Sequence, residues 1–196
     1  MKWEFRTGGI PDEMFIRGKV PMTKAEIRAV TLSKLKLKDS SRVADVGSGT
    51  GSIAIEVAHI CTKGKVFAIE RNREGIELIR KNCEAFGVTV EILHGNGSEC
   101  LKRIDTLDRM IIGGSGGELD KILTLAQEKL SMEGICVINC ITVETLYEAK
   151  STLKEKGFQS IDVISLSIAR GKQRGNYTIM EAINPIYILT GIKREL

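Results

Sequence analysis

Short apolar runs alternate along the chain with longer stretches in which apolar residues recur every three or four positions. Seven runs have the length and composition of strands, at residues 43–46, 66–69, 88–93, 110–112, 135–139, 161–168 and 179–192. The apolar spacing also predicts helices over residues 50–59, 73–86, 118–130 and 143–156. Strands and helices therefore alternate regularly up to about residue 157.

Residues suited to begin and end helices lie at the boundaries of two of these stretches. Asn72 and Thr142 come directly before a helix, where their side chains can accept a hydrogen bond from a free backbone N–H group. Gly87 and Gly157 come directly after a helix, where a left-handed C-terminal turn favours glycine. The regular alternation predicts a parallel sheet with helices on both faces.

The last two strands depart from this alternation. Runs 161–168 and 179–192 are joined by ARGKQRGN, residues 169–176, a polar loop with no room for a crossover helix. Without a crossover helix, the two strands should pair antiparallel. The predicted fold class is α/β, with a seven-stranded, mostly parallel sheet closed by a C-terminal antiparallel hairpin. This arrangement resembles the Rossmann-like sheet of class I S-adenosylmethionine-dependent methyltransferases.

Composition and charge narrow the classes of protein to consider. The 196 residues are 42% hydrophobic and 28% charged, which predicts a single domain over residues 1–196. The first residues carry charges where a signal peptide or membrane helix needs an unbroken apolar run, which predicts a cytoplasmic protein without a membrane partner. Because 25 Asp and Glu offset 29 Lys and Arg, the net charge of +4 does not indicate a nucleic-acid partner.

The cysteines and histidines form no pattern typical of a metal site or a disulfide framework. The chain has five cysteines, without a CxxC pair, and two histidines. We therefore expect no bound metal and no structural disulfides. The cysteines are expected to be thiols packed in the core.

The segment VADVGSGTG, residues 43–51, joins a predicted strand to a predicted helix. Glycines are needed there because the backbone must turn sharply and approach a ligand, while the start of the helix presents free N–H groups. Ser52 stands where the dinucleotide fingerprint GxGxxG requires Gly or Ala. The spacing, with Asp45 ahead of it, resembles motif I of methyltransferases and predicts S-adenosylmethionine as the cofactor. The loop residues expected to bind it are Gly47, Ser48, Gly49, Thr50 and Gly51.

Polar residues that suit the remainder of this cofactor follow the next two strands. Glu70 ends the second strand, where its carboxylate can accept hydrogen bonds from both ribose hydroxyls. Asn96 and Gly97 follow the third strand, where an amide can recognise the adenine amino group and glycine can let the backbone approach the ring. The alternatives are a solvated acid at a strand end and an ordinary Asn-Gly turn.

Further motifs extend the similarity beyond the superfamily. These are GIPDEMF at 9–15, VPMTKAEIR at 20–28, DVGSGTG at 45–51, IIGGSGGEL at 111–119 and SIARGKQRG at 167–175. Together they closely resemble the cobalt-precorrin-6B C15-methyltransferase (decarboxylating) family of anaerobic cobalamin biosynthesis, over essentially the whole chain. The resemblance implies methyl transfer to C15 of a cobalt-containing tetrapyrrole with loss of carbon dioxide from the C12 acetate, giving cobalt-precorrin-7. It also suggests a homotetramer.

The run GGSGG, residues 113–117, stands where amine methyltransferases usually present a [DN]PP[FY] segment. Its glycines leave room for a broad, flat macrocycle at the place where the substrate meets the methyl group. Ser115 is the residue of this run expected to contact the substrate. The alternative is a flexible loop with a helix cap at Ser115 or Gly117.

Two further predictions follow from the resemblance. Thr23 is expected to place its hydroxyl near the methionine end of the cofactor, although Thr23 followed by Glu26 is also a capping box. Arg170 is expected to pair with a substrate carboxylate, together with Lys172 and Arg174 on the same hairpin loop. The alternative for these three is a solvated hairpin.

Two other functions share the same cofactor core. A pI near 8.8 would also suit an RNA (tRNA) methyltransferase, although no large additional RNA-binding domain is present. A non-catalytic nucleotide-binding subunit could use the glycine loop for assembly alone. The sequence identifies no catalytic acid or base for the decarboxylation.

Overall fold

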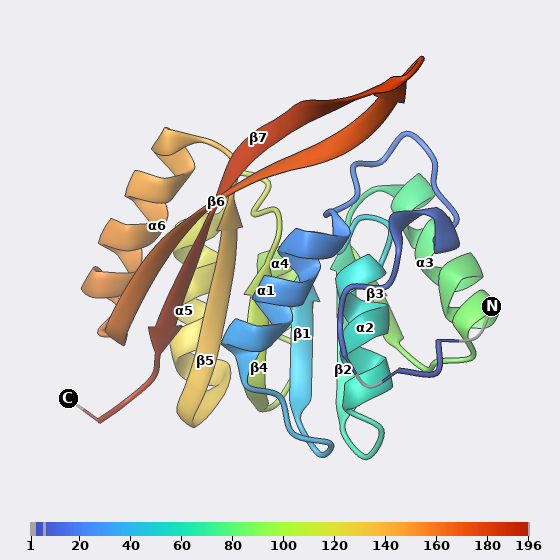
Figure 1. Cartoon of the computed structure of the whole chain (residues 1–196). Coiled ribbons are helices and arrows are strands. Elements are labelled where there is room, and N and C mark those ends of the chain that lie inside the picture. Colours follow the sequence, from blue (N-terminus) through green and yellow to red (C-terminus); the bar gives the residue numbers. More distant parts are fainter. Residues whose placement is uncertain (1–2, 6, 196) are drawn as a thin grey trace.

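Seven strands form one twisted sheet in the order β3-β2-β1-β4-β5-β7-β6 (Figure 1). The structure is a computed structural model that describes residues 3–5 and 7–195, so the ends of the predicted domain 1–196 lie outside the described residues. The strands are β1 Arg42–Val46, β2 Lys65–Glu70, β3 Glu91–His94, β4 Leu107–Ile112, β5 Leu130–Cys140, β6 Gln159–Arg174 and β7 Tyr177–Ile192. Strands β1 to β5 pair in parallel, whereas β7 is antiparallel to both β5 and β6. The predicted fold class is confirmed.

Helices cover both faces of the sheet (Figure 1). They are η1 Asp12–Met14, α1 Ala25–Leu35, α2 Ser52–Ile60, α3 Arg73–Phe86, α4 Gly97–Leu101, α5 Leu119–Lys129 and α6 Val143–Glu155. One buried cluster packs the sheet against α1, α2 and α3, and another packs it against α4, α5 and α6. In β4, Ile111 belongs to the first cluster, whereas Met110 and Ile112 belong to the second. Because both faces are buried there, residues 110–112 of β4 form a continuous apolar run.

The predicted boundaries of α3 and the predicted start of α6 hold, whereas α6 ends at Glu155, one residue before its predicted end. Asn72 and Thr142 each accept a hydrogen bond from a backbone N–H in the first turn of their helix, at 2.8 and 3.1 Å. Gly87 and Gly157 take the left-handed conformation, with φ of 66° and 81°. These local signals are sufficient because both partners lie within a few residues of each other.

Other boundaries differ from the prediction. Helix α2 begins at Ser52 and not at residue 50, because Gly51 precedes it with a left-handed φ of 79°. Strand β3 begins at Glu91 and not at residue 88. Helix α5 ends at Lys129, because Leu130 already pairs with Leu107 and starts β5. The apolar spacing did not predict α1, and only the capping-box alternative at Thr23 and Glu26 indicated a helix start there.

The polar loop predicted for residues 169–176 is wrong. Strand β6 continues to Arg174 and β7 begins at Tyr177, with cross-strand pairs along the whole length. We call residues 168–183 the arm, because this part of the hairpin projects beyond the body of the protein (Figure 1). In a projecting arm neither face of the ribbon is covered by a helix, so polar residues there are compatible with strand pairing. Within the described residues, no helix is long and apolar enough to cross a membrane.

Candidate active site

A cavity of about 690 Å³ opens at the carboxyl ends of β1, β2 and β4. The strand order reverses between β1 and β4, which is the place where open α/β sheets bind ligands. Its walls are the glycine loop after β1, the loops after β2, β3 and β4, and an N-terminal segment, residues 9–24, of which residues 19–23 line the cavity. Ile141 and Ile186 form an apolar end. The volume falls in the range of small-molecule sites.

The glycine loop closes tightly against other main-chain segments. Gly47, Gly49 and Gly51 have φ of 73°, 59° and 79°, a conformation that side chains disfavour. A Cβ atom at Gly47 would lie 2.5 Å from the carbonyl oxygen of Gly114, and one at Gly49 would lie 3.0 Å from that of Pro21. The loop therefore needs glycine because of its backbone conformation and because the neighbouring main chain leaves no room for a Cβ atom.

The GGSGG run after β4 is the other half of this backbone contact. Gly114 lies against Gly47, and a Cβ atom at Gly116 would lie 2.7 Å from the guanidinium of Arg71. Ser115 lines the cavity. The predicted alternative of a cap at Ser115 or Gly117 is wrong, because Glu118 precedes the first turn of α5. Packing between the two loops is thus one reason for these glycines. The predicted room for a substrate is a separate reason.

Glu70 is fixed at the wall of the cavity and is only 8% exposed. Its carboxylate accepts hydrogen bonds from the backbone N–H groups of Gly49 at 2.8 Å and Asn72 at 2.7 Å. The alternative of a solvated acid is therefore wrong. A carboxylate has about four acceptor positions, so it can still accept bonds from two hydroxyls.

Asp45 is a second buried carboxyl at the cavity, 1% exposed. Burial raises the pKa of Asp45 to about 6, although hydrogen bonds from Ser48 and a backbone N–H oppose the shift, and the charge of Glu70 adds to it. The Ser48 hydroxyl donates to Asp45 at 2.6 Å. Asp45 thus changes its charge in mildly acidic solution.

Asn96 and Gly97 both line the cavity, at the start of α4. Among the described residues, no partner binds the side-chain amide of Asn96, which leaves it available for a ligand. Gly97 has a packing reason that the sequence did not show. A Cβ atom there would lie 2.8 Å from Val46 and 2.9 Å from Ile122, so glycine lets α4 approach the core.

Thr23 lines the cavity, but the capping-box alternative is wrong. Helix α1 is preceded by Lys24, with no side-chain cap from this residue. The Asp12 carboxylate instead accepts a hydrogen bond from the backbone N–H of Ala25 at 2.9 Å. Because Asp12 comes from thirteen residues earlier, local sequence spacing did not indicate it.

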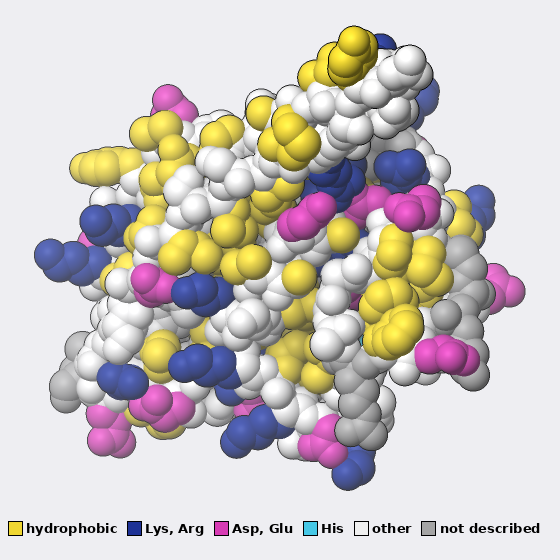
Figure 2. Space-filling view, viewed as in Figure 1, with side chains coloured by type: hydrophobic (Ala, Val, Ile, Leu, Met, Phe, Trp, Pro, Cys, Tyr) yellow, Lys and Arg dark blue, Asp and Glu magenta, His cyan; other side chains and the backbone are white. Residues whose placement is uncertain are grey.

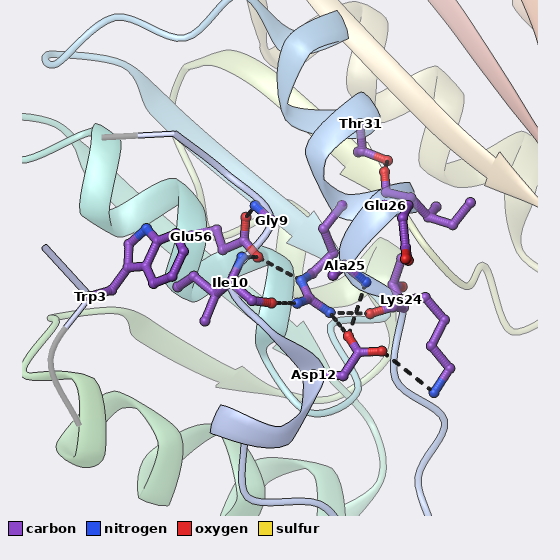
Figure 3. Close-up of polar contacts among 12 residues, drawn as sticks. Trp3, Gly9, Ile10, Asp12, Lys24, Ala25, Glu26, Thr31 and Glu56 are labelled. Atoms are coloured by element: carbon purple, nitrogen blue, oxygen red, sulfur yellow. Dashed lines mark hydrogen bonds and ion pairs between the residues drawn. The ribbon is translucent and has the colours of Figure 1, made fainter. Parts of the chain in front are cut away.

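The N-terminal segment is anchored by a buried arginine. Arg28 is fully buried and donates to Glu56 at 2.7 Å, to Asp12 at 2.8 Å, and to the carbonyl oxygens of Ile10 and Thr23. Figure 3 shows three of these acceptors, Ile10, Asp12 and Glu56, converging from different parts of the chain. Burial alone would raise the pKa of Asp12, but Arg28 and two further cations lower it overall. The segment is therefore held by buried charge-assisted bonds.

Asn82 connects the same segment to the glycine loop. It is fully buried on α3, accepts from the N–H of Ile16 at 2.7 Å, and donates to the carbonyl oxygens of Ile16 at 3.0 Å and Thr50 at 3.1 Å. Thr50 is buried behind the loop, and neither it nor Gly51 lines the cavity. The structure therefore does not bring these two predicted residues to the cavity surface.

Sequence reasoning missed Arg28, Glu56 and Asn82. A signal for them exists, because each is a polar residue on the buried side of its helix. Glu56 interrupts an otherwise apolar run in α2, and Asn82 follows Ile79 at a spacing of three residues. Polar groups at such positions are stable only when they are paired, which predicts a network but not its partners.

Arg170 lies on the arm and not in the cavity. Its guanidinium donates to Glu26 at 2.9 Å and to Asp12 at 3.3 Å, and its side chain is 41% exposed. The hydrogen bond from Arg170 lowers the pKa of Glu26. Lys172 and Arg174 both pair with Glu181 of β7. The residue predicted to meet a substrate carboxylate thus meets two protein carboxylates in this structure.

The surroundings of the cysteine thiols favour their protonated form. All five are free. Burial raises the pKa of Cys61, Cys83 and Cys140 to about 11 and that of Cys136 to about 12. Over the described part of the chain, no three His, Cys, Asp or Glu side chains are grouped to hold a metal ion. The site therefore offers positioning and hydrogen bonding and no thiolate nucleophile.

Two solved structures share nearly the whole fold. The precorrin-6y C5,15-methyltransferase of Geobacter metallireducens has a TM-score of 0.90 and 37% identity, over 94% of this chain and 97% of that chain. The precorrin 8w decarboxylase of Methanobacterium thermoautotrophicum has a TM-score of 0.89 and 33% identity, over 93% of this chain and 98% of that chain. Sheet order, glycine loop and these similarities define a class I methyltransferase.

The sequence relatives narrow this class to a family. The probable cobalt-precorrin-6B C(15)-methyltransferase (decarboxylating) of Pyrobaculum calidifontis is 42% identical over 194 residues, covering 97% of this chain and 98% of the relative. The precorrin methyltransferase domain matches residues 13–193. The chain belongs to this precorrin methyltransferase family, as its motifs indicated.

Proposed function

We propose that this enzyme transfers a methyl group from S-adenosylmethionine to C15 of cobalt-precorrin-6B, with loss of carbon dioxide from the C12 acetate, giving cobalt-precorrin-7. The observation that carries the proposal is one cavity with two unlike ends. The glycine loop and the carboxylate of Glu70 line it beside β1 and β2, whereas Ile141 and Ile186 line it beside β5 and β7, on the other side of β4. The similarity to relatives of that name extends over nearly the whole chain.

The polar end of the cavity fits S-adenosylmethionine. Seven of the predicted residues line it: Thr23, Gly47, Ser48, Gly49, Glu70, Asn96 and Gly97. Glu70 would accept the ribose hydroxyls, and the free amide of Asn96 would bind adenine. Thr50 and Gly51 would shape the loop from behind, because Asn82 holds the carbonyl oxygen of Thr50.

The chain contributes positioning to the reaction. S-adenosylmethionine supplies an electrophilic methyl group on its sulfonium. The glycine loop and the N-terminal segment fix one reactant, while Ser115 and the apolar end orient the other. Holding two reactants in line and excluding water lowers the barrier without a covalent intermediate on the protein.

The proposal also covers assembly and location. We infer a cytoplasmic homotetramer of single-domain chains, without a nucleic-acid or membrane partner. Support for association comes from the arm, where Tyr177, Ile179 and Met180 are 76%, 51% and 63% exposed. Light scattering should give about 86 kDa, four times the 21.6 kDa of one chain. A mass of one chain would contradict this part.

The reaction itself is tested with purified protein, S-adenosylmethionine and cobalt-precorrin-6B, followed by mass spectrometry. The expected product has gained one methyl group and lost carbon dioxide. Transfer of labelled methyl into bulk tRNA would instead show an RNA methyltransferase. Binding of S-adenosylhomocysteine without turnover of any late corrin intermediate would show a non-catalytic subunit.

A further inference from the structure

Three apolar side chains stand exposed where β5 leads into α6. Ile141, Val143 and Tyr147 are 75%, 64% and 75% exposed. Val143 and Tyr147 lie four residues apart in α6 and therefore on the same side of the helix. Hydrophobic side chains gather at the surface over this end of α6 (Figure 2). Single exposed apolar residues need no explanation, but neighbouring ones indicate a binding surface.

The fold itself does not require these side chains. Helix α6 packs on the core through Ala149, Thr152 and Leu153, which lie on its other side. The helix start is already capped by Thr142. Exposure of Ile, Val and Tyr therefore brings no stability to the isolated chain.

The three residues continue the apolar end of the cavity. Cys140 pairs with Tyr187 in the antiparallel register, which places Ile141 next to Ile186 just beyond the last pair. Both isoleucines line the cavity. The apolar surface thus begins at the cavity, at Ile141 and Ile186, and continues to Val143 and Tyr147 near the start of α6.

A tetrapyrrole would need such a surface. A cavity of about 690 Å³ suits one ligand of cofactor size, so a larger second reactant must extend out of it. The faces of a corrin precursor are broad and apolar, whereas its carboxylates lie at the rim. The wall that continues outward from this part of the cavity exposes the apolar side chains of Ile141, Val143 and Tyr147. The acids Glu144 and Glu148 are also exposed on α6.

We propose that Ile141, Val143 and Tyr147 form a platform that receives one face of the tetrapyrrole macrocycle. The proposal rests on the proposed function and assigns the substrate to this surface. Tyr147 would stack its ring on the macrocycle, and Ile141 would contact it beside the methyl group to be transferred. The platform therefore determines substrate affinity and leaves cofactor affinity unchanged.

The double variant Ile141→Ser with Tyr147→Ser tests the platform. We expect KM for cobalt-precorrin-6B to rise at least tenfold, while the Kd for S-adenosylhomocysteine, measured by calorimetry, stays within twofold. The single variant Tyr147→Phe, which keeps both Ile141 and an aromatic ring, should retain most of the wild-type affinity for the corrin. Met132→Ser is the matched control, since Met132 is also an exposed apolar residue, 49% exposed, but lies near the start of β5.

Several results would overturn the platform. An active wild type whose KM is unchanged in the double variant would exclude it and leave the proposed function intact. If the wild-type protein did not turn over the corrin, both the platform and the proposed function would be excluded. If light scattering showed that the double variant dissociates into smaller species, the surface would be a contact with a second copy of this chain instead.

Discussion

The N-terminal segment and the arm are held against the body of the protein in opposite ways. The N-terminal segment is anchored by Arg28 and Asn82, which are fully buried and bind its main chain directly. The arm is connected to the body through Arg170, whose ion pair with Glu26 is exposed to solvent on both sides. Buried charge-assisted bonds fix one geometry, whereas exposed pairs exchange readily with water and ions. The N-terminal wall of the cavity is therefore preformed, whereas the arm can exchange its contacts with the body.

The largest effect is expected from removing the buried cation. Arg28→Met would leave the carboxylates of Asp12 and Glu56 buried without their partner. We expect a loss of about 3 to 5 kcal/mol in the free energy of unfolding, measured by urea denaturation. Arg80→Ala is the control, because its pair with Glu77 is exposed, and it should leave stability almost unchanged. Similar losses in both variants would contradict the comparison.

The second-largest effect is expected from Gly47→Ala, which changes the loop predicted to bind the cofactor. A methyl group there would meet the backbone of Gly114 at 2.5 Å, at a φ of 73°. The clash and the strain together should cost about 3 kcal/mol and weaken binding of S-adenosylhomocysteine at least tenfold in calorimetry. In Gly117→Ala the left-handed conformation is the same but no atom lies within 4 Å, so a smaller loss is expected. Equal effects would mean that the contact between the two loops is unimportant.

Asp45 makes the cofactor side sensitive to pH. Its pKa is raised from 3.8 to about 6, so its neutral form favours the folded state; this contribution is present below pH 4 and is lost as the pH rises through 6. Relative to Asp45→Asn, wild-type stability should fall by about 2 to 3 kcal/mol between about pH 4 and pH 7. Urea unfolding at both pH values measures this. A constant difference between the two proteins would contradict the prediction.

The smallest effect is expected on the arm. Arg170→Ala removes an exposed ion pair to Glu26 and a longer one to the buried Asp12, which keeps Arg28 as its partner. The free energy of unfolding should therefore change by less than about 1 kcal/mol. The affinity for S-adenosylhomocysteine should stay unchanged. If Arg170 also exchanges its protein partners for a substrate carboxylate, KM for the corrin should rise. A large loss of stability would show that the arm is held as firmly as the N-terminal segment.

The same contrast explains what the sequence could predict. Strands, glycine loop and the caps at Asn72 and Thr142 depend on residues within one short stretch, so their patterns are visible locally. The pairing of Ile16 with Asn82 joins residues 66 positions apart, and no local pattern names such a partner. Polarity alone also failed at residues 169–176, because an uncovered strand and a loop have the same composition.

The same distinction between local patterns and contacts of distant residues applies to the candidate site. Glu70 and Asn96 were predicted from their places at strand ends, and both line the cavity. Arg170 was predicted to meet the substrate from a motif and an assumed loop, and it lies outside the cavity on strand β6. The glycine at position 97 was predicted, but its packing reason depends on Val46 and Ile122, which only the folded chain brings near.

A crystal structure of the protein soaked with S-adenosylhomocysteine tests the central claim most directly. The account predicts that both ribose hydroxyls lie within hydrogen-bonding distance of the Glu70 carboxylate and that the main chain of residues 9–24 keeps its position on Arg28 and Asn82. A ligand bound away from Glu70, or a rearranged N-terminal segment around it, would contradict a preformed cofactor site.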